Sequence, residues 1–329
     1  MIWTNETCCA FEGQLLSRVL PPVLLLECLL GMLGNGGALW IFCFYVKPWK
    51  SSTVFLFNLA LADFLLIVIL PFRAVYYLRE LDWAHGDGFC RIALFMLAMN
   101  RGGSIFFLTA VAVDRYLRVV HPHHPANSAP VSRSICVAVA VWLLTISLTA
   151  YLLFERRHFP GHFPEHNKTY CDSFIICPNS TSNGHRAIFV FSFYLPLAVI
   201  LFCTLQVVLQ LRKQQRDRQG RIQRALHLIV LVAGVFAISF LPANVTQLMI
   251  WANNSKECKS FERLDTAFYI TVSLTYLNSV LDPLVYYFSS PAFKKVYRRV
   301  ARLSLRKSEE PSPAQDKTRD TGSQSLSQL

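Results

Sequence analysis

A single arginine lies in the middle of a long apolar stretch. Arg101 falls within residues 92–120, where most of its neighbours are apolar. If this stretch is a helix that rises about 1.5 Å per residue, the arginine is about 16 Å from Cys90 and about 21 Å from Arg115. Its guanidinium therefore cannot easily reach either end of the stretch. A buried guanidinium needs a carboxylate, and the planar fork of arginine suits bidentate binding of that group.

Two interpretations of Arg101 stay open at this point. It could form an internal ion pair with Asp63 or Asp282, which lie in other apolar stretches. Alternatively, it could bind an external anion at the bottom of a pocket, because an ionisable residue at such a depth is usually functional. Arg73, nearer the end of its own stretch, is a second candidate anchor, although an arginine there could also extend to the surface.

Oxygen-bearing side chains on three apolar stretches form a second group. They are Asp63, Ser104, Asn278 and Asp282. Ser104 follows Arg101 by three residues, so both would lie on one face of a helix. Several oxygen ligands favour a hard cation. A small ion could therefore neutralise the carboxylates, with a hydrogen-bonded water cluster as the alternative.

The composition shows what must position these residues. Of 329 residues, 53% are hydrophobic and 16% are charged, whereas soluble domains carry about 25% charged residues. A membrane-spanning helix needs about 20 apolar residues, and alternating strand patterns are absent. We therefore predict an all-α membrane protein, a bundle of seven transmembrane helices. The spans are 19–46, 54–78, 92–120, 135–154, 187–211, 226–251 and 264–288.

The distribution of basic residues predicts the orientation. The net charge is +12; 20 Lys and Arg lie on one side of the spans and 11 on the other, with Arg101 completing the 32. The richer side is cytosolic by the positive-inside rule, so we expect an extracellular N-terminus and a cytoplasmic C-terminus. Residues 1–17 contain no Lys or Arg, which favours a first span that acts as an uncleaved signal-anchor. The charge thus reflects topology, and nucleic acid is not an expected partner.

Glycosylation triplets agree with this orientation. Candidate acceptors on the outer side are Asn5, Asn167 and Asn179, with a further triplet at Asn253. Another triplet begins at Asn244, inside the sixth span, and should be unmodified.

The ten cysteines divide by compartment. Four fall within the spans. The other six lie on the outer side, where disulfides persist, and they are Cys8, Cys9, Cys90, Cys171, Cys177 and Cys258. Full pairing is possible, and spacing alone allows fifteen connectivities.

Two other classes of membrane protein are disfavoured. A transporter would usually show two related halves, and no internal repeat is visible. The chain is also not expected to be an enzyme, because its histidine cluster, His121, His123 and His124, has no acidic partner nearby. We expect no catalytic residues, no cofactor beyond the possible small ion, and no other metal.

Short motifs on the seven spans resemble those of rhodopsin-like G-protein-coupled receptors over about residues 15–300. The strings are Gly34-Asn35, Leu59-Ala60-Leu61-Ala62-Asp63, Asp114-Arg115-Tyr116, Trp142, Pro196, Phe240-Leu241-Pro242 and Asp282-Pro283-Leu284-Val285-Tyr286. The resemblance implies a Cys90–Cys171 disulfide and a sodium site at Asp63, Ser104, Asn278 and Asp282. It also implies a G-protein-coupling and activation group made of Asp114, Arg115, Tyr116 and Tyr286, in which Asp114 restrains Arg115 until activation.

Within that family, the chain most resembles the hydroxycarboxylic acid receptors. The strings are Leu20-Pro21-Pro22, Trp40-Ile41-Phe42-Cys43-Phe44, Leu97-Ala98-Met99-Asn100-Arg101, Gly103-Ser104-Ile105, Val119-Val120-His121-Pro122-His123-His124 and Tyr286-Tyr287-Phe288-Ser289-Ser290-Pro291. The resemblance implies that Arg101 binds a ligand carboxylate and that Ser173 and Tyr276 assist it. It also implies Cys8–Cys177 and Cys9–Cys258 bridges that hold the N-terminus over the pocket.

These observations predict a cell-surface receptor for small hydroxy- or short-chain carboxylic acids. The resemblance implies coupling to inhibitory G proteins, which lower cyclic AMP. An alternative ligand is a long-chain oxo- or hydroxy-fatty acid, because Leu70-Pro71-Phe72-Arg73 and the string from Tyr276 to Pro283 also resemble the oxo-eicosanoid receptor.

The chain divides into four segments by composition. We expect an extracellular N-terminus at 1–18, the receptor domain at 19–288, an amphipathic juxtamembrane helix at 289–303 and a disordered cytoplasmic tail at 304–329. Serines and threonines in the tail are candidate phosphorylation sites, through which arrestin could bind. The expected location is the plasma membrane, crossed several times.

Overall fold

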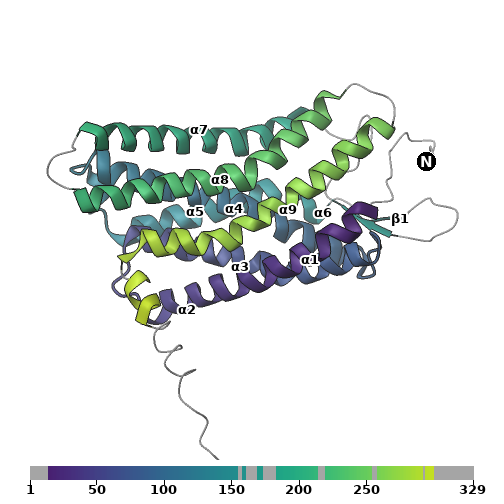
Figure 1. Ribbon diagram of the computed structural model, residues 1–329, viewed down its shortest axis with the longest axis horizontal. Coiled ribbons are helices and arrows are strands. Elements are labelled where there is room, and N and C mark those ends of the chain that lie inside the picture. Colours follow the sequence, from purple (N-terminus) through teal and green to yellow (C-terminus); the bar gives the residue numbers. More distant parts are fainter. Residues whose placement is uncertain are drawn as a thin grey trace, which may run out of the picture.

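The chain forms a bundle of long helices that lie side by side. In a computed structural model of the protein, the structure describes residues 14–154, 158–160, 169–172, 183–213, 219–253, 258–291 and 293–299. The long helices run along one common direction, and a short β-hairpin lies at one end of the bundle (Figure 1).

The helices follow one another in chain order. The first span consists of α1 (Gln14–Gly31), the π-helical turn η1 (Met32–Gly36) and α2 (Gly37–Phe44). Next come α3 (Ser51–Leu78), α4 (Gly86–Val120), the 3-10 turn η2 (Pro125–Ser128), α5 (Val131–Thr149) and α6 (Tyr151–Phe154). The last three are α7 (Asn183–Lys213), α8 (Gln219–Ala252) and α9 (Cys258–Ser289).

Six helical segments of the described chain are long and apolar enough to cross a membrane: Gln14–Phe44, Ser51–Leu78, Gly86–Val120, Val131–Phe154, Phe189–Gln210 and Leu226–Ala252. The seventh predicted span, 264–288, lies within α9. This helix is less apolar than the others because it contains several polar residues that are buried in the bundle. They are Ser273, Thr275, Asn278, Ser279 and Asp282. Its polar side chains face the protein interior and therefore avoid the cost of contact with lipid.

The interior of the bundle is closely packed. Helix α8 packs against α9, α1 against α3 and α9, and α4 against α3 and α7. Phe107, Phe193, Phe236 and Phe240 are fully buried, and the rings of Phe193 and Phe236 stack with centroids 5.4 Å apart. Leucines on the opposite faces, such as Leu33, Leu143 and Leu195, are exposed, as expected for helices that contact lipid.

A glycine allows the first and last spans to approach closely. A Cβ atom on Gly34 would lie 2.6 Å from Cγ of Pro283. Gly34 belongs to η1, and Pro283 lies inside α9. The Gly34-Asn35 motif therefore has a packing reason in this fold.

A two-stranded hairpin covers one end of the bundle. Strands β1 (His158–Pro160) and β2 (Thr169–Cys171) pair antiparallel, with His158 opposite Cys171. A Cys90–Cys171 disulfide, with Cα atoms 5.7 Å apart, ties the hairpin to α4. The expected disulfide is confirmed, whereas these short strands were not predicted from the sequence.

A short helical segment follows α9. Residues 293–299 are helical after a break at Ser290, whose Oγ accepts a hydrogen bond of 3.2 Å from the backbone N–H of Phe293. The ring of Phe293 packs 5.1 Å from that of Phe42. This segment therefore contacts the end of the first span. The expected tail at 304–329 lies outside the described residues.

Candidate functional site

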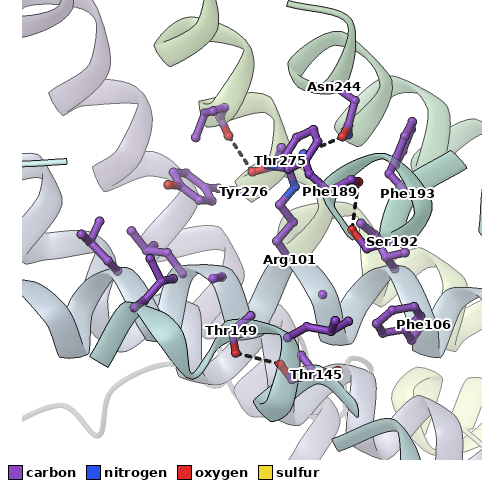
Figure 2. A pocket seen from close by; sticks show the side chains of 18 of the residues that line it. Arg101, Phe106, Thr145, Thr149, Phe189, Ser192, Phe193, Asn244, Thr275 and Tyr276 are labelled. Atoms are coloured by element: carbon purple, nitrogen blue, oxygen red, sulfur yellow. Dashed lines mark hydrogen bonds between the residues drawn. The ribbon is translucent and has the colours of Figure 1, made fainter. Parts of the chain in front are cut away.

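A cavity of about 170 Å³ lies between the helices. Its walls come from α3, α4, α5, α6, α7, α8 and α9, and Figure 2 shows Arg101 pointing from α4 toward side chains of α7 and α8. Most of the lining is apolar or aromatic, including Leu97, Ile105, Phe106, Leu148 and Phe193. Apolar walls with a few convergent polar groups are typical of small-molecule sites.

Arg101 is the central charged group of this cavity. Its Nη2 donates a hydrogen bond of 2.9 Å to Oδ1 of Asn244, and its Cζ lies 5.0 Å from the ring centroid of Phe189. None of the ion pairs in the described part of the chain includes Arg101. The structure therefore does not bring it together with Asp63 or Asp282. Its positive charge is held among neutral groups, which suits binding of an anion.

Arg73 also lines the cavity, but its surroundings are different. Its Nη1 donates a 2.8 Å hydrogen bond to the carbonyl oxygen of Cys171, and its Nη2 donates a 3.1 Å bond to Tyr77 Oη. Nη2 also lies 3.6 Å from Oδ1 of Asp172, which forms an ion pair with it. The guanidinium packs against Tyr76 and Tyr77, 4.8 and 5.3 Å from the ring centroids. Arg73 thus connects α3 to the hairpin.

The carboxylate of Asp172 interacts with Arg73 and with the side chains of Tyr76 and Tyr269. Tyr76 Oη donates a 3.0 Å hydrogen bond to its Oδ2, while Arg73 faces Oδ1. Burial raises the pKa of the Asp172 carboxyl, and Arg73 acts in the opposite direction. The ion pair therefore offsets only part of the cost of burying this acid.

Tyr276 and Ser173 are the other two residues that were expected to bind the ligand. Tyr276 is 8% exposed and lines the same cavity as Arg101 (Figure 2). Arg73 belongs to the same lining. Ser173 lies outside the described residues. The structure therefore gathers three of the four expected ligand-binding side chains around one cavity, and their contact with a ligand stays a prediction.

The expected sodium residues lie deeper, in a buried hydrogen-bonded network. Asp63 Oδ1 accepts hydrogen bonds from Ser104 at 3.3 Å and from Ser279 at 2.9 Å. Asn278 Nδ2 donates to Asp282 Oδ2 at 2.7 Å. The carboxyl groups of Asp63 and Asp282 also interact with each other, and a cation between them would offset the repulsion of two like charges.

Two oxygens in this network support the fit to a hard cation. Oδ1 of Asn278 and Oδ1 of Asp282 are buried and accept no hydrogen bond. Buried polar atoms are normally satisfied, and oxygen ligands are what such a cation prefers. The residues fit sodium, whose binding stays a prediction.

Sequence reasoning missed several members of these sites. Asn100 donates a 3.1 Å hydrogen bond to Asp63, and Ser279 donates to the same carboxylate. Asn100 precedes Ser104 by four residues, which could have placed both on one helix face. Asn244 was noted only as a glycosylation triplet; its position in an apolar span was the available signal. It is fully buried.

Tyr286 connects the activation group to the carboxylate network. Its Oη donates to Asn35 Oδ1 at 2.9 Å and to Asp63 Oδ2 at 3.1 Å. It thus lies with the expected sodium residues, between η1, α3 and α9.

The remaining activation residues lie at the far end of α4. Arg118 Nε donates to both carboxylate oxygens of Asp114, at 3.0 and 2.9 Å, and Ser52 Oγ donates at 2.8 Å. Arg115 Nε is 3.8 Å from Asp114, while its Nη2 donates to Ser289 Oγ at 3.1 Å. Asp114 therefore has Arg118 as its nearer cationic partner. Tyr116 Oη contacts His121 Nε2 at 3.0 Å.

Several other predictions fall outside the described residues. They concern Cys8, Cys9, Cys177 and the acceptors Asn5, Asn167 and Asn179, together with the side chain of Cys258. The four cysteines of the spans, Cys28, Cys43, Cys136 and Cys203, are free.

Comparison with known proteins agrees with this architecture. Residues 34–286 match the family described as 7 transmembrane receptor (rhodopsin family). The chain is 47% identical to Hydroxycarboxylic acid receptor 2 of Homo sapiens, covering 92% of this chain and 83% of that receptor. Identity to Hydroxycarboxylic acid receptor 1 of Homo sapiens is also 47%, over 92% of this chain and 86% of that receptor. Oxoeicosanoid receptor 1 of Homo sapiens is 38% identical, with coverage of 90% and 76%. The resemblance to this family and the seven-helix fold predicted from the apolar spans are confirmed.

Proposed function

The chain belongs to the rhodopsin family of seven-transmembrane receptors, and on this premise we propose that it binds a small hydroxy- or short-chain carboxylic acid. Members of this family and the similar proteins are receptors rather than enzymes. The chain is accordingly a multi-pass protein of the plasma membrane with a small-molecule ligand and a G-protein partner. The finer proposals concern the ligand, the orientation and the class of G protein.

The unpaired charge of Arg101 supports the ligand proposal. Among the described residues, its side chain contacts the amide of Asn244 and the ring of Phe189 but no carboxylate. A ligand carboxylate would supply the missing charge in a site sheltered from water. An uncharged analogue would leave the guanidinium desolvated and unmatched, so the site would reject it strongly.

The lining of the cavity agrees with a small ligand. Apolar and aromatic side chains such as Leu97 and Phe106 surround the charge of Arg101 in a cavity of about 170 Å³. A short hydroxy acid fits this space. The second candidate, a long-chain oxo- or hydroxy-fatty acid, is favoured by the similarity to Oxoeicosanoid receptor 1.

Signalling would depend on the cytosolic end of α4. The proposed orientation has an extracellular N-terminus and places the Asp114-Arg115-Tyr116 group in the cytosol. There Arg115 contacts Ser289 at the end of α9. Ligand binding would shift an existing equilibrium toward a conformation that binds an inhibitory G protein. Arrestin would bind the phosphorylated tail.

The buried carboxylate network would bias the same equilibrium. We propose that Asp63, Ser104, Asn278 and Asp282 hold a sodium ion, which when bound would supply the positive charge that two adjacent carboxylates need. Tyr286 donates to Asp63 in the present arrangement. A change at this carboxylate would therefore be transmitted to α9.

A guanine-nucleotide exchange assay tests the ligand proposal. Membranes that contain the receptor and an inhibitory G protein are exposed to carboxylates of increasing chain length, from lactate to a fatty acid of about twenty carbons. We expect a peak at short chains. Activity only with the longest acids would instead support the fatty-acid alternative, and exchange only on a stimulatory G protein would contradict the proposed lowering of cyclic AMP.

A pair of variants tests the anchor. Arg101→Ala should reduce potency by at least about 30-fold, because loss of a buried charge pair costs about 2–5 kcal/mol. The matched control is Arg79→Ala, since Arg79 is an exposed arginine at the end of α3. Surface expression of both variants is measured in parallel. An unchanged response of Arg101→Ala at normal surface expression would refute the anchor.

A further inference from the structure

Asn244 is the polar side chain that contacts the guanidinium of Arg101 in the cavity. We propose that the neutral amide oxygen of Asn244 positions the Arg101 guanidinium without cancelling its positive charge. The receptor then prefers a ligand with a carboxylate over an uncharged ligand of the same shape. This inference rests on the proposed function, because it assumes that Arg101 meets a ligand carboxylate. Neither the expected site residues nor the motifs included Asn244.

The hydrogen bonds of Asn244 determine which way its amide points. Nδ2 donates to the backbone carbonyl of Phe240 at 2.7 Å, and Oδ1 accepts from Arg101 Nη2 at 2.9 Å. A carbonyl only accepts and a guanidinium only donates. The opposite orientation would place donor against donor and acceptor against acceptor. The amide oxygen therefore faces Arg101.

The position of Asn244 makes this contact specific. Asn244 is fully buried, lies on α8 one helical turn after Phe240, and lines the same cavity as Arg101. Its bond to Phe240 fixes the amide against its own helix. The contact thus bridges α4 and α8 across the cavity, as Figure 2 shows.

The neutrality of the acceptor has a chemical consequence. An amide oxygen orients the guanidinium without cancelling its charge, whereas a carboxylate at the same place would neutralise it. Arginine carries five N–H donors, and Asn244 accepts from one nitrogen. The ring of Phe189 lies 5.0 Å from Cζ and covers a face of the guanidinium rather than accepting at its edge. Donors and an uncompensated charge remain for a ligand.

Substitution by aspartate isolates this role. Asn244→Asp keeps the shape of the side chain but places a carboxylate against Arg101. The ligand carboxylate must then compete with an internal ion pair, while an uncharged analogue no longer leaves Arg101 unmatched. The ratio of potencies between an acid and its amide should therefore collapse, an effect that a loss of packing would not produce.

The experiment uses 3-hydroxybutanoate and 3-hydroxybutanamide as probes in the exchange assay, on the full-length receptor in membranes. We expect Asn244→Asp to lose at least about 30-fold in potency for the acid and to show no loss for the amide. Asn244→Leu, which removes the acceptor but leaves the charge, should lose about tenfold for the acid and keep the preference for it. Gln247→Glu is the matched control: Gln247 is also buried on α8, one turn away, and is not part of the cavity lining.

The outcomes separate this inference from the proposed function. A wild-type receptor that responds to neither probe nor to any other carboxylate refutes the proposed function. If the wild type prefers the acid and Asn244→Asp keeps that preference at normal surface expression, Asn244 does not set the charge. An equal collapse in Gln247→Glu would show a general effect of buried charge and would also overturn the inference. If Asn244→Asp fails to reach the surface, Asn244→Leu decides, because an unchanged potency there contradicts a positioning role.

Discussion

The ion pair between Arg73 and Asp172 should stabilise the receptor by joining α3 to the hairpin. The two groups are 3.6 Å apart, with side chains 5% and 17% exposed. At an effective dielectric constant of about 20, two unit charges at this distance attract by about 5 kcal/mol. Because burial opposes part of this attraction, we expect a net coupling of about 2–3 kcal/mol.

A double-mutant cycle measures this coupling. The variants are Arg73→Met, Asp172→Asn and the two combined, and the measurement is the thermal midpoint of the purified receptor in detergent. Arg73→Met leaves a buried acid without its cation and should cost about 3–5 kcal/mol, or about 6–10 °C at roughly 2 °C per kcal/mol. The double variant should lose less than the sum of the two single variants, because it leaves no unmatched charge.

The size of the coupling tests how the two cavity arginines differ. A coupling below about 0.5 kcal/mol, the level expected when sites act independently, would refute the reasoning. The charge of Arg73 would then be available, as that of Arg101 is, and the expectation of a second ligand anchor would be supported instead.

Three further predictions concern the packing, the cytosolic end and the N-terminus. Gly34→Ala should lower the thermal midpoint because its Cβ would meet the ring of Pro283 at 2.6 Å, whereas Gly36→Ala, with open space around its Cβ, should not; equal midpoints would contradict this close packing. Arg118→Ala should release Asp114 to pair with Arg115 and so reduce nucleotide exchange without ligand; unchanged or increased basal exchange would oppose this. Replacing the adjacent N-terminal cysteine pair by serines should weaken the carboxylate response, and full potency would show that the expected bridges are incidental.

The spans were predictable, but their ends were not. The predicted fifth and sixth spans, 187–211 and 226–251, are shorter than α7 (Asn183–Lys213) and α8 (Gln219–Ala252). Hydropathy locates the part of a helix that lies in hydrocarbon. The helical backbone continues into basic residues such as Arg221 because its hydrogen bonds do not depend on apolar side chains.

The sequence by itself determined that Arg101 is unusual. Placing a charged residue far from both ends of an apolar helix costs free energy wherever the other helices lie. The importance of Arg101 could therefore be recognised from the order of residues along the chain. The same reasoning located Asp63 and Asp282. The disulfide between Cys90 and Cys171 was predicted by the family resemblance instead.

Only the tertiary structure decided which partner each charged group has. Arg73 and Arg101 were both candidate anchors, yet Asp172 next to strand β2 forms an ion pair with the first, while Asn244 of α8 contacts the second. These partners lie 99 and 143 residues away along the chain, as 172 − 73 and 244 − 101 show. Electrostatic compensation depends on distances of a few ångströms in space, and the packing of the helices and the hairpin sets those distances.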